Sequence, residues 1–394
     1  MSATTHYLDH AATTPMVPEA VAAVAAALAE TGNPSSLHGS GRRARRQVEE
    51  SREQVAVCLG ARSAEVVFTS GGTEADNLAV KGLYWSRNGS DPRRRRILVS
   101  AVEHHAVLDP AAWLHTSEGA RVELLPVDPS GTLRLDALAD AIARDPDDVA
   151  LVSCMWANNE VGAVQPLAEV VAMAHDHGIP VHSDAVQAVS TEPVDFAGSG
   201  LDAMTVTGHK IGGPVGSGVL LVRRELLLVP LLHGGGQERD LRSGTLDVAS
   251  VRGLAVALAH AVEHRTGLAR RLRGLRDNLE ARVTESVADV CVNAAADRLP
   301  GTSHLTFGGC VGDDLLMLLD AQGVECSTGS ACSAGVPQPS HVLLAMGRDE
   351  RAAAGSLRLS LGRTSTATDV DAFVDAIAPA VERARAAGLV AARA

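Results

Sequence analysis

The alternation of strand-like runs with helix-like stretches is the feature that most constrains the fold of this chain. Strands that alternate with helices predict a mainly parallel sheet covered by helices on both faces, and therefore an α/β fold. Short runs rich in valine, isoleucine and leucine recur along the first part of the sequence. Seven of them are expected strands: residues 65–69, 97–100, 122–125, 149–153, 179–184, 203–207 and 218–222.

The pattern changes in the last third of the chain. Residues 246–285 are strongly helical, with an expected break near Thr266 and Gly267, and short strands and helices follow. A chain of 394 residues is long enough for two domains. We expect a large seven-stranded domain over residues 15–260, and a smaller α+β domain built from residues 1–14 and 261–394.

Polar side chains gather just after the expected strands. They are Thr73, His104, Asn159, Asp184, Gln187, Thr207 and Lys210. In open α/β sheets, ligands bind at the edge formed by the carboxyl ends of the strands. The sequence therefore predicts a ligand site at this edge.

Lysine is almost absent from the sequence, so few side chains could supply a reactive primary amine. Only Lys81 and Lys210 occur, because the other basic side chains are arginines. Lys81 lies in an ordinary helical pattern that leads to Gly82. Lys210 lies on a turn at a strand end, where a primary amine could form a Schiff base with an aldehyde cofactor. The alternative is a solvated loop lysine.

Three other features fit such a cofactor, and each also has a structural explanation. The turn at Gly71, Gly72 and Thr73 begins a helix, and helix N-termini bind phosphate; glycine turns after strands are also common. Asp184 could face a pyridine nitrogen, or cap a helix. His104 could stack on an aromatic ring, or be a structural histidine.

Other enzyme classes lack their motifs. Neither lysine follows a glycine, which excludes a Walker A loop, and no Gly-x-Ser-x-Gly elbow accompanies the His-Gly-Gly-Gly run that starts at His233. A net charge of -12 argues against general nucleic-acid binding. The run Arg93 to Arg96 could contact an acidic partner, but a solvated or salt-bridged loop is favoured.

The six cysteines are scattered without a Cys-x-x-Cys motif, which is typical of a reducing cytoplasm, and no signal peptide or membrane span is visible. Cys58, Cys154 and Cys291 lie among apolar residues and are expected in the core. Cys332 lies in a loop of small residues, where an exposed thiol could be a nucleophile or an incidental cysteine.

The chain resembles the group I cysteine desulfurases (IscS/NifS type), a branch of the class V aminotransferases among fold-type I pyridoxal-phosphate enzymes. The resemblance covers nearly the whole chain. The segments that carry it are residues 7–14, 32–36, 69–74, 103–107, 157–162, 182–187, 208–210, 233–245, 327–332 and 356–363.

The resemblance implies a role for each matching residue. Lys210 would hold pyridoxal 5'-phosphate, and Cys332 would carry the persulfide. Phosphate ligands would be Gly72, Thr73, Thr207, His209 and, from a second subunit, Thr245. Asp184 would pair with the pyridine nitrogen, Gln187 and Asn159 would touch the ring hydroxyl region, and His104 would stack on the ring and assist proton transfer. Arg358, helped by Asn33, would bind the substrate carboxylate.

The implied activity is conversion of L-cysteine to L-alanine by a cytoplasmic homodimer. The sulfur would pass to an iron–sulfur scaffold or a sulfur-carrier protein, for iron–sulfur cluster assembly or another thiolation. No resident metal is expected, although Cys332 could bind a transient iron–sulfur cluster. Selenocysteine lyase, an aminotransferase of the same fold, and desulfurases dedicated to tRNA thiolation or DNA phosphorothioation are the alternatives. A relay role for Cys326 is left open.

Overall fold

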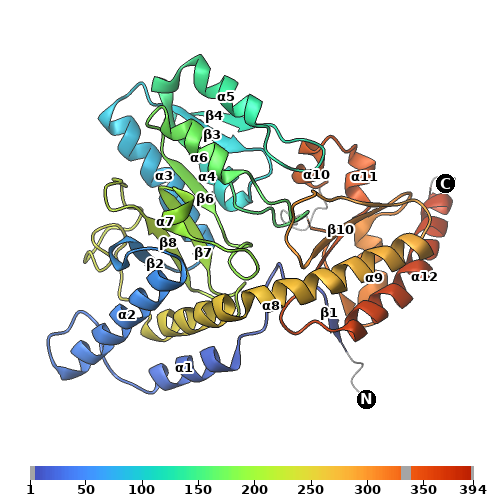
Figure 1. Cartoon of the computed structure of the whole chain (residues 1–394), viewed down its shortest axis with the longest axis horizontal. Helices are drawn as coiled ribbons and strands as arrows, with labels where there is room; N and C mark the ends of the chain where they lie inside the picture. The colour runs from blue at the N-terminus through green and yellow to red at the C-terminus, as the bar shows by residue number, and fades with distance from the viewer. Residues whose placement is uncertain (1–4, 330–338, 392–394) are drawn as a thin grey trace.

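The structure is a computed structural model that describes residues 5–329 and 339–391. Its main feature is a seven-stranded sheet in the order β2-β8-β7-β6-β5-β3-β4 (Figure 1). The strands are β2 (Val66–Thr69), β3 (Arg96–Ser100), β4 (Arg121–Leu125), β5 (Val149–Ser153), β6 (Val181–Asp184), β7 (Ala203–Thr207) and β8 (Gly218–Val222). β8 runs opposite to the other six strands of this sheet, which are parallel to one another, so the expected mainly parallel sheet is confirmed.

Both faces of this sheet are apolar because alternate strand residues point to opposite sides. In β2, for example, Val67 packs in one core cluster, whereas Val66 and Phe68 pack in another. One face is covered by α3 (Gly72–Ser90) and α4 (His105–Glu118). The other face is covered by α1 (Pro18–Leu28), α2 (Gly39–Cys58), α5 (Leu135–Arg144), α6 (Leu167–His175), α7 (Phe196–Ser199) and the first half of α8 (Val248–Ser286).

Helix α8 joins this layer to a second hydrophobic core. Its 39 residues span about 58 Å at 1.5 Å per residue, and Figure 1 shows it running from below the large sheet across to α9 and α12. Leu254 and Leu258 pack in the first core, whereas Leu272 and Leu279 pack in the second. The expected break near Thr266 and Gly267 is wrong. A glycine costs only about 1 kcal/mol inside a helix, and packing at both ends offsets it.

The second core surrounds a three-stranded sheet in the order β12-β10-β9 and a two-stranded parallel pair, β1 with β11. The strands are β1 (His6–Tyr7), β9 (Val290–Val292), β10 (Thr302–Phe307), β11 (Val324–Glu325) and β12 (Ser356–Ser360). The helices are α9 (Gly312–Asp320), α10 (His341–Ala345), α11 (Glu350–Ala354) and α12 (Ala367–Ala391). Because the N-terminal strand pairs in this part of the molecule, we propose that residues 1–14 belong with residues 261–394 in a small domain.

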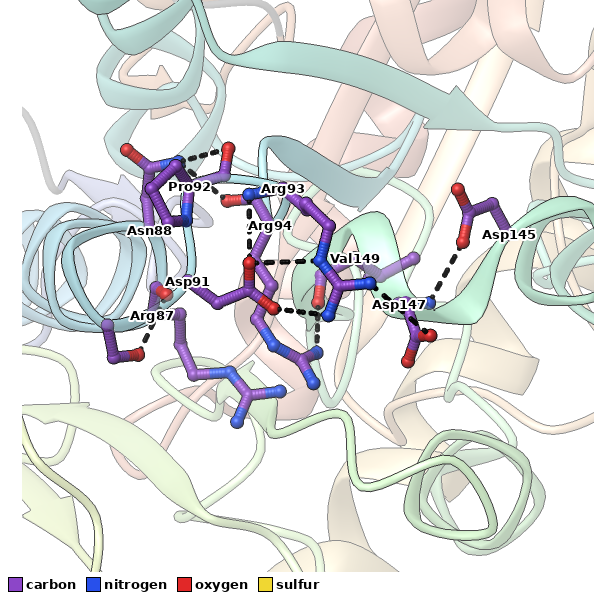
Figure 2. A network of polar contacts seen from close by, with 10 residues as sticks. Arg87, Asn88, Asp91, Pro92, Arg93, Arg94, Asp145, Asp147 and Val149 are labelled. Atoms are coloured by element: carbon purple, nitrogen blue, oxygen red, sulfur yellow. Dashed lines mark hydrogen bonds and ion pairs between the residues drawn. The ribbon is translucent and has the colours of Figure 1, made fainter.

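The arginine run after α3 is engaged within the chain (Figure 2). Asp91 accepts hydrogen bonds from the Arg93 guanidinium at 2.8 and 3.1 Å, and Arg94 donates to the carbonyl of Val149 at 3.1 Å. Arg96 is buried and donates to Asp148 at 2.8 Å. These contacts favour the structural explanation of this run over a docking surface.

Two of the cysteines expected in the core differ in their burial. Cys291 is exposed, because it lies on the edge strand β9, so its expected burial is wrong. Cys154 is buried as expected.

Among residues 5–329 and 339–391, no helix combines the length and the apolar character needed to cross a bilayer.

Candidate active site

A cavity of about 420 Å³ opens at the carboxyl ends of the strands, where the sequence predicts a ligand site. The structure brings most of the predicted residues together there. Those that line the cavity are Gly72, Thr73, His104, Asn159, Asp184, Gln187, Thr207, His209, Lys210 and Arg358. Asn33 and Thr245 do not line it; both are exposed. Cys332 lies outside the described residues, but Ser327 and Gly329, which precede it, line the cavity.

Lys210 follows β7 on a compact turn. The amide of Gly213 donates to the carbonyl of Gly208 at 2.8 Å, and a side chain at position 208 would lie 2.2 Å from the Ser217 hydroxyl. Glycine therefore lets the turn close tightly and direct Lys210 into the cavity. Burial lowers the pKa of the Lys210 amine, and Asp184 partly opposes this effect. The site thus raises the share of neutral amine, which is the nucleophilic form.

Asp184 is the last residue of β6 and is almost completely buried. Its Oδ1 accepts a hydrogen bond from the amide of Val186 at 2.8 Å. Burial, followed by the nearby carboxylate of Asp76, raises the Asp184 pKa to about 7. A cationic group beside Asp184 would reverse this shift, because an opposite charge favours the ionised carboxylate.

The N-terminus of α3 forms one wall of the cavity and has no side-chain cap. Gly71 has φ of 155°, a conformation that favours glycine. A Cβ on Gly218 of β8 would lie 2.6 Å from the Gly71 carbonyl carbon, so two glycines allow the strand and the turn to touch. Free amides at the start of a 19-residue helix, beside Thr73 and Thr207, form an anion site.

His104 is the N-cap of α4 and also lines the cavity. Its Nδ1 accepts a hydrogen bond from the amide of Ala106 at 3.1 Å, so in the neutral ring the proton lies on Nε2. Burial, followed by the charge of Lys210, lowers the His104 pKa to about 4. The ring is therefore neutral near pH 7 and presents an N–H group. This tautomer suits stacking and hydrogen-bond donation better than proton abstraction.

Arg358 reaches the cavity from the small sheet. It is buried on β12 and donates to Asp9 Oδ1 at 2.7 Å and to the carbonyl of Asn159 at 3.1 Å. Within residues 5–329 and 339–391 its Nε has no hydrogen-bond partner. Asp9 belongs to the N-terminal segment and Asn159 follows β5, so two distant parts of the chain hold this guanidinium.

Asp76, which the sequence motifs did not single out, also lines the cavity. It lies on α3 and is 1% exposed. An acidic residue among the apolar residues of α3 could have indicated a buried functional carboxylate. The sequence alone does not show which face of this helix packs against the sheet. Cys326 is also buried, and burial raises its pKa to about 12, which disfavours the reactive thiolate.

Comparison with known proteins gives concordant results. The family model described as aminotransferase class-V matches residues 6–373. An "IscS-like cysteine desulfurase" of Mycobacterium tuberculosis is 59% identical over 98% of this chain and 98% of its own. A solved "NIFS-LIKE PROTEIN" superposes with a TM-score of 0.89 at 34% identity, over 96% of this chain and all of that one. "SspA in complex with cysteine" has a TM-score of 0.79 at 33% identity, over 91% and 99% of the two chains.

Proposed function

The chain belongs to the aminotransferase class-V family, and on that premise we propose that it is a pyridoxal-phosphate-dependent cysteine desulfurase. Such an enzyme converts L-cysteine to L-alanine and holds the released sulfur as a persulfide. The observation that carries the proposal is the convergence of Lys210, Asp184, His104 and Arg358 on one cavity. The full-length relative named as a cysteine desulfurase and the related structure that contains cysteine support the same reaction.

The donor set of the cavity fits pyridoxal 5'-phosphate. The free amides at the start of α3, with Thr73, Thr207 and His209, suit a phosphate. Asp184 suits a protonated ring nitrogen, the neutral His104 ring suits an aromatic face, and Gln187 and Asn159 also line the cavity. When bound, this cofactor supplies an electron sink that stabilises negative charge on substrate carbon.

We assign Arg358 to the substrate carboxylate. The planar guanidinium of arginine can donate two parallel hydrogen bonds to a carboxylate. Asp9 and the Asn159 carbonyl hold the Arg358 guanidinium in place. We also assign the movement of the substrate α-proton to the Lys210 amine. Its pKa is lowered by burial, whereas the His104 ring already carries a proton on Nε2. Asn33 stays a proposed aid to carboxylate binding.

We assign sulfur abstraction to Cys332. Its thiolate would form a bond to the sulfur of L-cysteine as the carbon–sulfur bond breaks. The electron pair of the broken bond stays with the substrate carbon, which takes up a proton and becomes the methyl group of alanine. The sulfur is left as a persulfide on Cys332, ready for transfer to an acceptor thiol.

The assembly and the acceptor are part of the proposal. A homodimer would bring the exposed Thr245 of one subunit to the phosphate site of the other. A scaffold or sulfur-carrier protein would receive the sulfur in the cytoplasm, for iron–sulfur cluster assembly or another thiolation. The acceptor thiol must reach Cys332 rather than the enclosed lysine, because only the persulfide carries transferable sulfur.

Production of alanine and sulfide from L-cysteine with a reductant tests the proposal. Wild type, Cys332→Ala and the matched control Cys291→Ala, which removes an exposed cysteine elsewhere, are compared while visible spectra are recorded. We expect all three proteins to be yellow and only Cys332→Ala to lose turnover. Full activity of Cys332→Ala would overturn the sulfur-transfer step, and a colourless wild type after incubation with pyridoxal 5'-phosphate would overturn the cofactor assignment.

A further inference from the structure

Asp76 is a second acid in the cavity wall that the proposed mechanism does not use. It lies on α3, one turn after Gly72, and is 1% exposed. Among the described residues its Oδ1 has no hydrogen-bond partner, and His182 Nε2 lies 3.5 Å from it. A buried carboxylate destabilises a fold unless it is compensated, so its position at a ligand site points to a role in that site.

A buried row of polar side chains lies beneath Asp76 across three neighbouring strands. His182 on β6 contacts Ser153 on β5 at 3.0 Å through Nδ1, and Thr205 on β7 at 3.1 Å through Nε2. All three side chains are completely buried. The register places Ser153 beside His182 and Thr205 beside Asp184, so this row ends at the acid proposed for the ring nitrogen.

The row favours an ionised Asp76. Burial lowers the His182 pKa to about 4, so the ring is neutral. If the Ser153 hydroxyl donates to Nδ1, the ring proton lies on Nε2 and faces Thr205 and Asp76. The Thr205 hydroxyl lowers the Asp76 pKa, although burial outweighs this effect and raises it to about 7.

The charges that face Asp76 come from several elements. They are Asp184 at the end of β6, Lys210 on the turn after β7, and Glu103 between β3 and α4. The Asp76 carboxylate raises the pKa of Asp184, of Glu103 and of the Lys210 amine. Its negative charge therefore acts on both groups that would hold the two ends of the cofactor ring system.

We propose that Asp76 is a positioning residue of this site, which places a second negative charge in the cavity wall that holds Asp184 and strengthens the binding of a protonated ring nitrogen. The inference rests on the proposed function. Two neighbouring carboxylates ionise together only when a cation lies beside them, so the pair selects a positively charged ligand group. In this proposal, His182 and Thr205 hold the Asp76 carboxylate in position near Asp184.

The test exploits the scarcity of lysine. In a Lys81→Arg background the only remaining lysine is Lys210, so protein labelled with ¹³C at the lysine ε-carbon gives one lysine signal whose pH titration reports the Lys210 amine. Lys81 lies outside the cavity, 4.4 Å from the centre of the Trp113 ring. The cofactor-free protein is compared with Asp76→Asn, Thr205→Val and the conservative Thr205→Ser, and melting temperatures confirm that each variant is folded.

We expect the Lys210 titration midpoint to move to lower pH in Asp76→Asn and Thr205→Val, and to return in Thr205→Ser, which keeps the hydroxyl. In the cofactor-loaded proteins, the pH at which the visible absorbance changes should move in the same direction. The kcat of Asp76→Asn should fall about tenfold with little change in KM, because the charge acts on the chemical step.

Unchanged midpoints in a folded Asp76→Asn protein would overturn the inference, as would equal effects of Thr205→Val and Thr205→Ser. Asp184→Asn separates this failure from failure of the proposed function. If Asp184→Asn changes the cofactor spectrum and Asp76→Asn does not, only the inference fails. If neither Asp184→Asn nor Lys210→Ala changes the spectrum, the cofactor assignment itself is wrong.

Discussion

Replacement of Glu238 by alanine should destabilise the protein by about 3–5 kcal/mol, because it breaks a buried ion pair. Glu238 is 1% exposed and Arg52 is 7% exposed. The Glu238 carboxylate accepts hydrogen bonds from Arg52 at 2.6 and 2.8 Å and from the amide of Phe68 at 2.8 Å. Without Glu238, Arg52 keeps the carbonyl of Val66 at 2.8 Å and the half-exposed Glu49 at 3.2 Å.

The same substitution should weaken cofactor binding. Glu238 lies in residues 233–245, the segment that carries Thr245, and its amide donates to the carbonyl of Arg242 at 2.9 Å. Arg242 in turn contacts Glu74 on α3 at 2.9 Å. Loss of Glu238 removes one anchor of this segment, so Thr245 would be held less firmly for the phosphate of the partner subunit. We expect a higher Kd for pyridoxal 5'-phosphate.

Urea denaturation measures the stability change, and titration of the visible absorbance measures the cofactor Kd. Glu238→Gln should lose about 1.5–3 kcal/mol, since it removes the charge but keeps one acceptor. Glu225→Ala is the matched control: Glu225 is 71% exposed and lies 3.6 Å from Arg62, so the change should stay within about 0.5 kcal/mol. A loss below about 1 kcal/mol for Glu238→Ala would refute the argument from buried charge.

Three further predictions concern Arg358, the glycine contact beside α3, and the buried histidines. Arg358→Lys should raise the KM for L-cysteine about tenfold to a hundredfold, because lysine cannot form a two-pronged contact with a carboxylate; an unchanged KM would contradict its assignment. Gly218→Ala should weaken binding of pyridoxal 5'-phosphate, since the new Cβ would lie 2.6 Å from the Gly71 carbonyl carbon; equal cofactor Kd values would show that the turn adapts. In the cofactor-free protein, buried His182 and His304 should contribute stability that is lost as pH falls from about 6.5 toward 4, whereas Asp76 and Asp184, with pKa values raised to about 7, act in the opposite direction over this range. The pKa of His182 is about 4 and that of His304 about 3, below the ordinary value of 6.5, so at these two groups the unfolded chain binds more protons. Urea midpoints of wild type and His304→Asn at pH 7 and 5 isolate the histidine effect because the carboxylates are common to both proteins; an equal pH dependence in the two would count against it.

The sequence was sufficient to predict the layer architecture and most of the cavity wall. Each strand of a parallel sheet is a short apolar run, and its carboxyl end points to the same edge as its neighbours, so the residues after the runs had to converge. His104, Asp184, Thr207 and Lys210 do converge. Local patterns alone predicted a break in α8 that does not exist, because the helix is held by two separate cores.

By itself, the sequence determined which chemistry is available: one lysine after a strand, an acid at the end of the strand before it, and a glycine turn that begins a helix. Only the tertiary structure decided the protonation states of these groups. Burial lowers the Lys210 and His104 pKa values and raises that of Asp184, and Asp76 joins the site because α3 packs on the sheet with that side inward. A pKa depends on desolvation and on charges from distant parts of the chain, and neither is a property of local sequence.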